Sequence, residues 1–222
     1  MRKIAYSILI FLAVTFLCTS CEKRQVELSK EVYSYLIAID ESTTNISHDI
    51  YQVWNMAIFE DDDITIEKLD ENLYLSKTEI QDGIVKSIWY LATYGQSAPL
   101  SYEESSEEDR LKARNLQVLG LKLYDSFSDY IEAVVNAYTI NGEYEELFQK
   151  QESAKLIMKE ISQKYSSYEH YQTLKEYYTA VSSYLELCMY PEGSLRSFQQ
   201  ARDDYLKKTR NIRNDLDLVF SD

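Results

Sequence analysis

The chain has 222 residues, of which 45% are hydrophobic and 27% charged, so its composition is that of a globular protein rather than a disordered one. Five Gly and two Pro are too few for the many turns of a β-rich protein and favour a small number of long helices. The 37 Asp and Glu residues outnumber the 23 Lys and Arg residues, and a net charge of −14 repels phosphate backbones. We therefore expect no nucleic-acid partner, and any membrane attachment has to be covalent or apolar.

The amino terminus has the three parts of a signal peptide. Two basic residues at 2–3 precede an apolar run at 4–17, and two small residues at 19–20 stand directly before Cys21. The apolar run is shorter than the roughly 20 residues of a membrane-spanning helix. An uncleaved anchor helix is the alternative, but the polar residues 22–24 end the run abruptly. The pattern predicts an exported protein whose residues 1–20 are removed.

The small-small-Cys site at Cys21 resembles the lipobox of bacterial lipoproteins. The resemblance implies that the Cys21 thiol carries a diacylglyceryl group with acyl chains such as palmitate. It also implies a mature chain, 21–222, held by lipid on the outer face of the cell membrane. Each buried methylene contributes about 0.8 kcal/mol, so several acyl chains hold a protein stably. The site departs from the family pattern at the third position before Cys21. Leu is usual there, but this chain has Cys18, and its Leu17 lies one position earlier.

The first long helix is predicted over residues 26–59, where apolar positions alternate at spacings of three and four, as in the buried stripe of a bundle helix. At 1.5 Å per residue, such a helix spans about 50 Å. The acidic residues 60–63 are expected to begin the next helix, because carboxylates stabilise a helix N-terminus. They lack the Gly and the final Glu of an EF-hand, so no calcium site is expected there. The apolar stripe of the helix predicted over 26–59 consists of Val32, Tyr35, Ile39, Ile46, Ile50, Val53 and Ala57.

The next two predicted helices are separated by the clearest loop in the sequence. One helix is predicted over residues 64–94, with Gly83 inside it at a close helix contact or a kink, because Gly in a helix costs about 1 kcal/mol relative to Ala. Residues 95–105 contain Gly and Pro and form the loop. Two capping-box spacings within 101–108 then begin a third helix, which ends at Asn141-Gly142.

The carboxyl-terminal part contains three more predicted helices. One covers residues 143–162, and a regular stripe over 168–188 marks the next. The Pro and Gly of residues 191–193 end that helix, and Ser194 caps a last one that runs to residue 219. Because the helices are long and the connections short, neighbouring helices are expected to be antiparallel. The predicted fold is all-α, an elongated antiparallel bundle of five to six helices in a single domain, 21–222.

The sequence contains no recognisable catalytic or metal-binding constellation. His48 and His170 are the only histidines, and neither has a second ligand at helical spacing. The phosphate-binding, dinucleotide-binding, nucleophile-elbow and paired-cysteine motifs are absent from the sequence. Carboxylate pairs occur throughout so acidic a chain, so no glycosidase pair is selected. Cys188 lies in an apolar helical register and is expected to be a buried thiol. We therefore expect no catalytic residue, no cofactor and no metal, and a protein that is not an enzyme.

Tyrosine is the unusual residue, with 20 copies. Its ring is apolar and its tip is polar, so it suits surfaces that are only partly dry. Tyr165, Tyr177 and Tyr184 lie off the main stripe of the predicted helix over 168–188, so we expect them to be partly exposed and to contribute to a binding surface for a protein, a peptide or a glycan. The alternative is that these rings occupy half-buried positions in the bundle.

Two short segments resemble a group of uncharacterised helical proteins of Gram-positive bacteria. Residues 53–60, VWNMAIFE, are similar to its W-x-x-A-I-[YF] signature, with Met56 in place of the usual Asn. Residues 191–198, PEGSLRSF, are similar to its P-x-G-S-L-x-[ST]-F turn. Residues 95–143 have no counterpart in the group. The resemblance implies an exported helical protein and no particular activity.

Three hypotheses for the function follow. The first is a surface-tethered interaction protein of the cell envelope, and the alternative is a lipoprotein that binds a ligand or solute in a pocket between helices. An envelope hydrolase is the third. A closed bundle without a cavity would argue against the second hypothesis. A cleft with two close carboxyls of raised pKa would favour the third.

Overall fold

The structure is a computed structural model in which every regular element of the described residues is a helix, as the sequence predicts. The side chains of residues 2–22, 115–118 and 127–129 are not described. The description of the backbone covers residues 2–59, 71, 73–87, 89, 101–118, 127–165 and 168–220.

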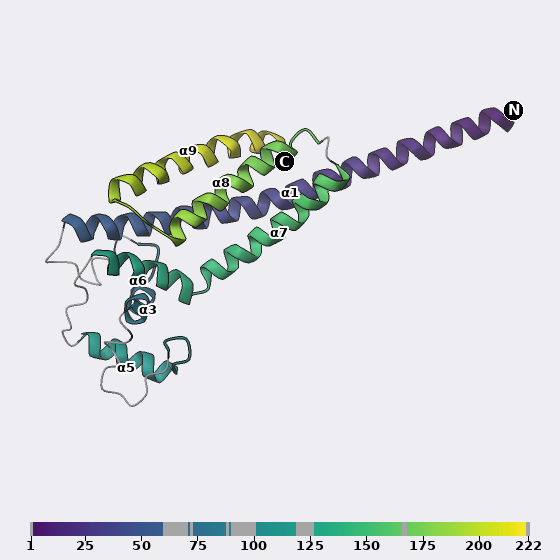
Figure 1. Ribbon diagram of the computed structural model, residues 1–222. Coiled ribbons are helices and arrows are strands. Elements are labelled where there is room, and N and C mark those ends of the chain that lie inside the picture. The colour runs from purple at the N-terminus through teal and green to yellow at the C-terminus, as the bar shows by residue number, and fades with distance from the viewer. Residues whose placement is uncertain are drawn as a thin grey trace.

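The long helix α1 (Arg2–Phe59) is the axis of the molecule, and it ends at the predicted residue. Its amino-terminal part extends alone beyond the other helices (Figure 1). Among the described side chains the first buried one is Leu28, and the predicted stripe from Val32 onwards faces the core. Among the described residues, no helix combines the length and the apolar character needed to cross a membrane.

Three helices pack against α1 and form the bundle: α7 (Glu143–Lys164), α8 (Tyr171–Met189) and α9 (Leu195–Phe220). Figure 1 shows that α7 and α8 run in opposite directions, and that α8 and α9 do so as well, as the short connections between them predict. The helix α8 contacts both α1 and α9, so two of its faces are covered. The Pro191–Gly193 turn ends α8, and the backbone N–H of Ser197 donates to the Ser194 hydroxyl at 3.2 Å to cap α9.

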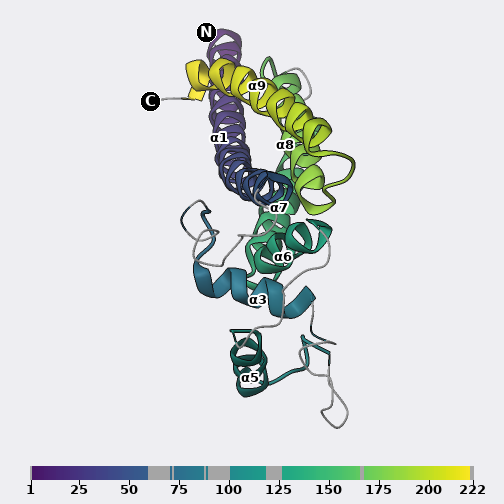
Figure 2. The same ribbon diagram turned by 90° about the vertical axis from the view of Figure 1, so that its left-hand side faces the viewer.

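A second group of helices lies beside the end of α1: α3 (Lys77–Ser87), α5 (Glu107–Val118) and α6 (Phe127–Ile140). α6 contacts α1 and α3, while α5 contacts α3. Figures 1 and 2 both show α3 between α6 and α5. A Cβ added at Gly83 would lie 2.0 Å from the carbonyl oxygen of Ala133, so this Gly permits the close contact of α3 with α6. Of the two predicted reasons for Gly83, close helix contact is the correct one.

Two predicted helices differ from the structure. Residues 73–76 are not helical, so a single helix over 64–94 is wrong. α3 begins after Ser76, whose backbone N–H and hydroxyl both donate to Glu79 Oε2, at 2.8 and 2.6 Å. Ser76 and Glu79 thus form a capping box at the start of α3, which the predicted helix over 64–94 does not include as a helix start. A single helix up to Ile140 is also wrong, because α5 and α6 lie on opposite sides of α3.

Candidate functional site

A row of buried polar residues runs along the face of α1 that meets α8 and α9. Asp40, Thr43 and Ser47 belong to this row, and all three are buried. Burying a polar group is unfavourable unless the group is hydrogen-bonded. The hydrogen-bond partners of each residue therefore decide whether it stabilises the bundle or serves another purpose.

Tyrosine hydroxyls are partners of Asp40 and Ser47, whereas the Thr43 hydroxyl has no hydrogen-bond partner among the described residues. Tyr33 donates to Asp217 Oδ1 at 2.5 Å and to the Arg213 carbonyl oxygen at 3.2 Å. The Tyr184 and Ser47 hydroxyls share a hydrogen bond of 2.5 Å. Each of these tyrosines packs its ring in the core and places its hydroxyl on a polar group of another helix. The high tyrosine content is thus partly explained by the polar row.

The predicted exposure of Tyr177 and Tyr184 is wrong, because both side chains are 0% exposed. The ring of Tyr184 stacks on that of Tyr205 in α9 at 5.4 Å, and the ring of Tyr177 lies 6.1 Å from that of Tyr33 in α1. Tyr165 is partly buried and packs against the core. The prediction assumed one buried stripe on α8, whereas α8 has two covered faces. The three tyrosines therefore do not form a common exposed surface.

Asp40 is the carboxylate of the polar row, and only one of its two oxygens has hydrogen-bond partners within the described residues. It is 5% exposed, and its Oδ2 accepts a hydrogen bond from the Tyr177 hydroxyl at 3.0 Å. The hydroxyl of Thr209, in α9, also donates to this carboxyl group. Oδ1 is buried and has no hydrogen-bond partner in the described part of the chain. A carboxylate oxygen can accept hydrogen bonds from two donors, so the hydrogen-bonding capacity of Oδ1 is unused.

Asp40 lines a cavity between α1 and α9 with a volume of about 260 Å³. Leu206 is the one apolar residue among those named in its lining, and the others carry hydroxyl, amide, carboxyl or guanidinium groups. Its volume lies just below the ~300–1,000 Å³ of typical small-molecule sites. The other lining residues are Glu41, Thr44 and Asn45 from α1, with Thr209, Arg210 and Arg213 from α9.

Two arginines of α9 line this cavity, and they differ in their partners. Arg213 forms an ion pair with Glu41 at 3.0 Å and approaches Asp217 at 4.0 Å. Arg210 is exposed and has no hydrogen-bond or ion-pair partner within the described residues. The lining of the cavity therefore includes Asp40, which has one buried carboxylate oxygen without a partner in the described part of the chain, and Arg210, whose guanidinium group has no partner there either.

Burial raises the pKa of Asp40 above its ordinary value. Hydrogen bonds from Tyr177 and Thr209 and the charge of Arg213 act in the opposite direction, but they do not compensate for the lost hydration. A cation that reached Oδ1 would favour the ionised carboxylate. A buried titratable group with a perturbed pKa beside a cavity is characteristic of a functional site.

Asp49, on the same helix, shows what a fully used buried carboxyl group looks like. Its Oδ1 accepts the backbone N–H of Tyr74 at 3.0 Å. Its Oδ2 accepts the backbone N–H of Leu75 at 3.1 Å and the Tyr138 hydroxyl at 2.6 Å. Asp49 thus attaches the non-helical residues 73–76 and helix α6 to α1, and it has a structural role.

A second hollow, of about 450 Å³, lies between α7 and α8. It is larger and more apolar, with Phe148, Tyr178 and Met189 among its lining residues. Its Gln151 amide donates to the Ser182 hydroxyl at 2.7 Å. Among the described residues, none of the buried polar atoms without a partner belongs to its lining. Within the described residues, the lining of the α7–α8 hollow therefore has no buried polar atom without a hydrogen-bond partner, whereas the lining of the α1–α9 cavity includes Asp40, whose Oδ1 is such an atom.

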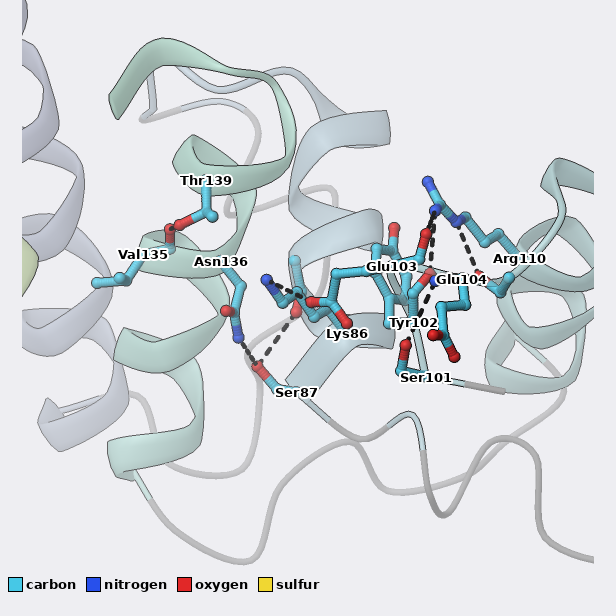
Figure 3. A network of polar contacts seen from close by, with 12 residues as sticks. Lys86, Ser87, Ser101, Tyr102, Glu103, Glu104, Arg110, Val135, Asn136 and Thr139 are labelled. Carbon is cyan, nitrogen blue, oxygen red and sulfur yellow. Dashed lines mark hydrogen bonds and ion pairs between the residues drawn. The ribbon is translucent and has the colours of Figure 1, made fainter. Parts of the chain in front are cut away.

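The polar network around Arg110 is also structural (Figure 3). Arg110 donates to the Tyr102 carbonyl oxygen and to the Ser105 hydroxyl, both at 2.9 Å, and its guanidinium lies 4.4 Å from the centre of the Tyr102 ring. Lys86 of α3 pairs with Glu103 at 3.0 Å. These contacts hold the 101–105 turn and α5 against α3. The charges of Lys86, Glu103 and Arg110 all have partners within this network.

The remaining candidate residues do not form a chemical site. In the described ranges no group of three or more His, Cys, Asp or Glu side chains could hold a metal ion. Cys188 is fully buried, its thiol donates to the Thr43 carbonyl oxygen at 3.8 Å, and burial raises its pKa, so it is a structural thiol as predicted. The acidic residues 60–63 lie outside the described residues, as does the side chain of Cys21.

Comparison of the chain with known protein families, curated proteins and solved structures finds no match. The two resemblances described above therefore stay expectations based on the residues quoted for them.

Proposed function

We propose that this protein is a lipid-anchored binding protein of the cell envelope that takes a small ligand with a positively charged group into the cavity between α1 and α9. The observation that supports the proposal is that Asp40 lines this cavity and that its buried Oδ1 has no hydrogen-bond partner within the described residues. An unsatisfied buried polar group costs about 1–3 kcal/mol. A ligand that donates to Oδ1 would recover this free energy on binding.

The anchor is the second part of the proposal. Cys21, the residue that resembles a lipidation site, lies on α1 about two turns before Leu28, where packing of the bundle begins. A lipid at that position would hold the bundle within roughly 10 Å of the membrane surface. The acidic surface has no attraction for anionic lipid, so acyl chains would supply the attachment.

Ligand binding is favoured over the two other hypotheses by particular residues. A tyrosine-based interaction surface loses two of its three members, because Tyr177 and Tyr184 are buried. A hydrolase would need two carboxyls directed at one substrate. At this cavity the second carboxyl, that of Glu41, is in an ion pair with Arg213. The cavity fits the alternative of a ligand-binding lipoprotein better than either.

The anchor is tested with Cys21→Ala in cells that receive a labelled fatty acid. We expect the label to be absent from the variant, and the protein to leave the membrane fraction or to accumulate as the uncleaved precursor. Cys18→Ala is the matched control and should be labelled like the parent chain. A Cys21→Ala protein that is still labelled and processed would contradict the assignment.

The binding site is tested by thermal unfolding of the full-length chain in detergent with methylammonium, ethylammonium or guanidinium chloride. A ligand at 100 times its Kd stabilises the folded state by about 2.7 kcal/mol, so at least one of these cations should raise the Tm. Asp40→Asn should abolish this rise. Asp215→Asn, which changes an exposed residue of α9, should keep it. An equal rise in the Asp40→Asn protein would disprove the site.

A further inference from the structure

The two free charges of the cavity come from opposite walls and have opposite signs. The Asp40 oxygen belongs to α1, whereas the Arg210 guanidinium belongs to α9. We propose that the ligand is a small zwitterion, with an ammonium group on Asp40 and a carboxylate on Arg210, as in an amino acid. This inference rests on the proposed function and specifies the class of ligand.

The spacing of the two charges favours a short ligand. Thr209 is buried and donates to the carboxyl group of Asp40. Arg210, the next residue on α9, is exposed and lines the same cavity as Asp40. The volume of this cavity is about 260 Å³, so a molecule that contacts both residues within it has to be short.

The carboxylate of the ligand is assigned to Arg210 rather than to Arg213. Arg213 is already engaged with Glu41 and Asp217, and its carbonyl oxygen accepts the Tyr33 hydroxyl. The planar guanidinium of a free arginine binds a carboxylate through two parallel hydrogen bonds. A ligand with only an ammonium group would approach Arg210 as a like charge and leave it unpaired.

The lining of the cavity also limits the rest of the ligand. Thr44 and Asn45 offer a hydroxyl and an amide, and Leu206 is the one apolar side chain. The cavity of about 260 Å³ holds a molecule of a few heavy atoms beyond the charged groups. A small or polar substituent is therefore preferred over a large aromatic one.

Isothermal titration of the full-length chain in detergent tests the inference with two sets of probes. Glycine, β-alanine and 4-aminobutanoate carry both charges at increasing separation. Ethylammonium and propionate each carry only one of them. We expect at least one zwitterion to bind about tenfold or more tightly than ethylammonium, since a second charge-assisted contact is worth about that factor. Propionate should bind most weakly, because the cavity contains the Asp40 carboxylate.

Variants of Arg210 separate the ligand class from the site. Arg210→Gln should weaken zwitterion binding about tenfold or more and bring it to the level of ethylammonium, while Arg210→Lys should recover part of the loss. Arg196→Gln, at an exposed position near the start of α9, controls for the change in net charge and should bind like the parent chain.

Two results would overturn the inference in distinguishable ways. If ethylammonium binds as tightly as the zwitterions and Arg210→Gln has no effect, the ligand is a simple cation, and the proposed function stands without the zwitterion. If none of the probes binds, the cavity holds water only, and the proposed function fails together with the inference. A loss in Arg196→Gln equal to that in Arg210→Gln would show a general charge effect and would also contradict the role of Arg210.

Discussion

Asp40 and Asp49 are both buried on α1, and burial raises the pKa of both. They differ in their hydrogen bonds. Asp49 uses both oxygens on three donors, whereas Oδ1 of Asp40 has no partner within the described residues and belongs to a residue that lines a cavity. Burial and the direction of the pKa shift are therefore the same for the structural carboxyl group and for the proposed ligand-binding one. The two differ in whether all carboxylate oxygens have hydrogen-bond partners.

The largest effect is expected at Asp49. Asp49→Ala leaves the backbone N–H groups of Tyr74 and Leu75 and the hydroxyl of Tyr138 without their acceptor. Loss of one member of a buried charged network is expected to lower the free energy of unfolding by about 3–5 kcal/mol. Urea unfolding of the full-length chain in detergent, followed by circular dichroism, measures this. A loss below about 1 kcal/mol would show that Asp49 has no such structural role.

The α3–α6 contact and the α1–α9 cavity should also differ in their tolerance of added or removed atoms. Gly83→Ala places a Cβ of α3 against the carbonyl oxygen of Ala133 in α6, where overpacking is expected to cost about 1–3 kcal/mol. Asn45→Ala in the lining of the cavity should change the free energy of unfolding by less than about 0.5 kcal/mol. The same urea titration compares the two variants, and equal losses would contradict the difference between the two regions.

The pH dependence of stability should also distinguish Asp40. A carboxyl group whose pKa is raised by folding stabilises the protein fully below its unfolded pKa, and this contribution is lost as pH rises through the folded pKa. The Asp40→Asn variant lacks this loss. Its stability relative to the parent chain should therefore be higher at pH 7 than at pH 4, as measured by urea unfolding at both values. A difference that falls with pH would mean that the folded state stabilises the Asp40 carboxylate.

Much of the bundle was predicted from local patterns. The end of α1 at Phe59, the cap at Ser194 and, to within two residues, the boundaries of α7 and α9 follow from helical spacing and turn residues in the sequence. The Ser76 capping box was missed, although its S-x-x-E spacing was present. The contact of Asp49 with Tyr74 could not be predicted, because it joins residues that are distant in sequence.

The candidate site was not predicted from the sequence. Asp40 is one of 37 acidic residues, and the adjacent Glu41 makes it look like part of a solvated face. One signal was present: Tyr33, Leu36, Asp40, Thr43 and Ser47 follow each other at alternating spacings of three and four. A second helical row beside the apolar stripe indicates that α1 is covered on more than one face. The same oversight led to the wrong prediction for Tyr177 and Tyr184.

The central claim is that Asp40 is retained for a ligand and Asp49 for the fold. Its most direct test is the free energy of unfolding of Asp40→Asn and Asp49→Asn at pH 7, measured side by side without ligand. Asn at 40 can keep the hydrogen bond from Tyr177 while it removes a buried charge, so this variant should be at least as stable as the parent chain. Asn at 49 turns an amide group toward backbone N–H donors, so that variant should lose about 2 kcal/mol. Similar losses in both variants would contradict the claim and make Asp40 a structural residue.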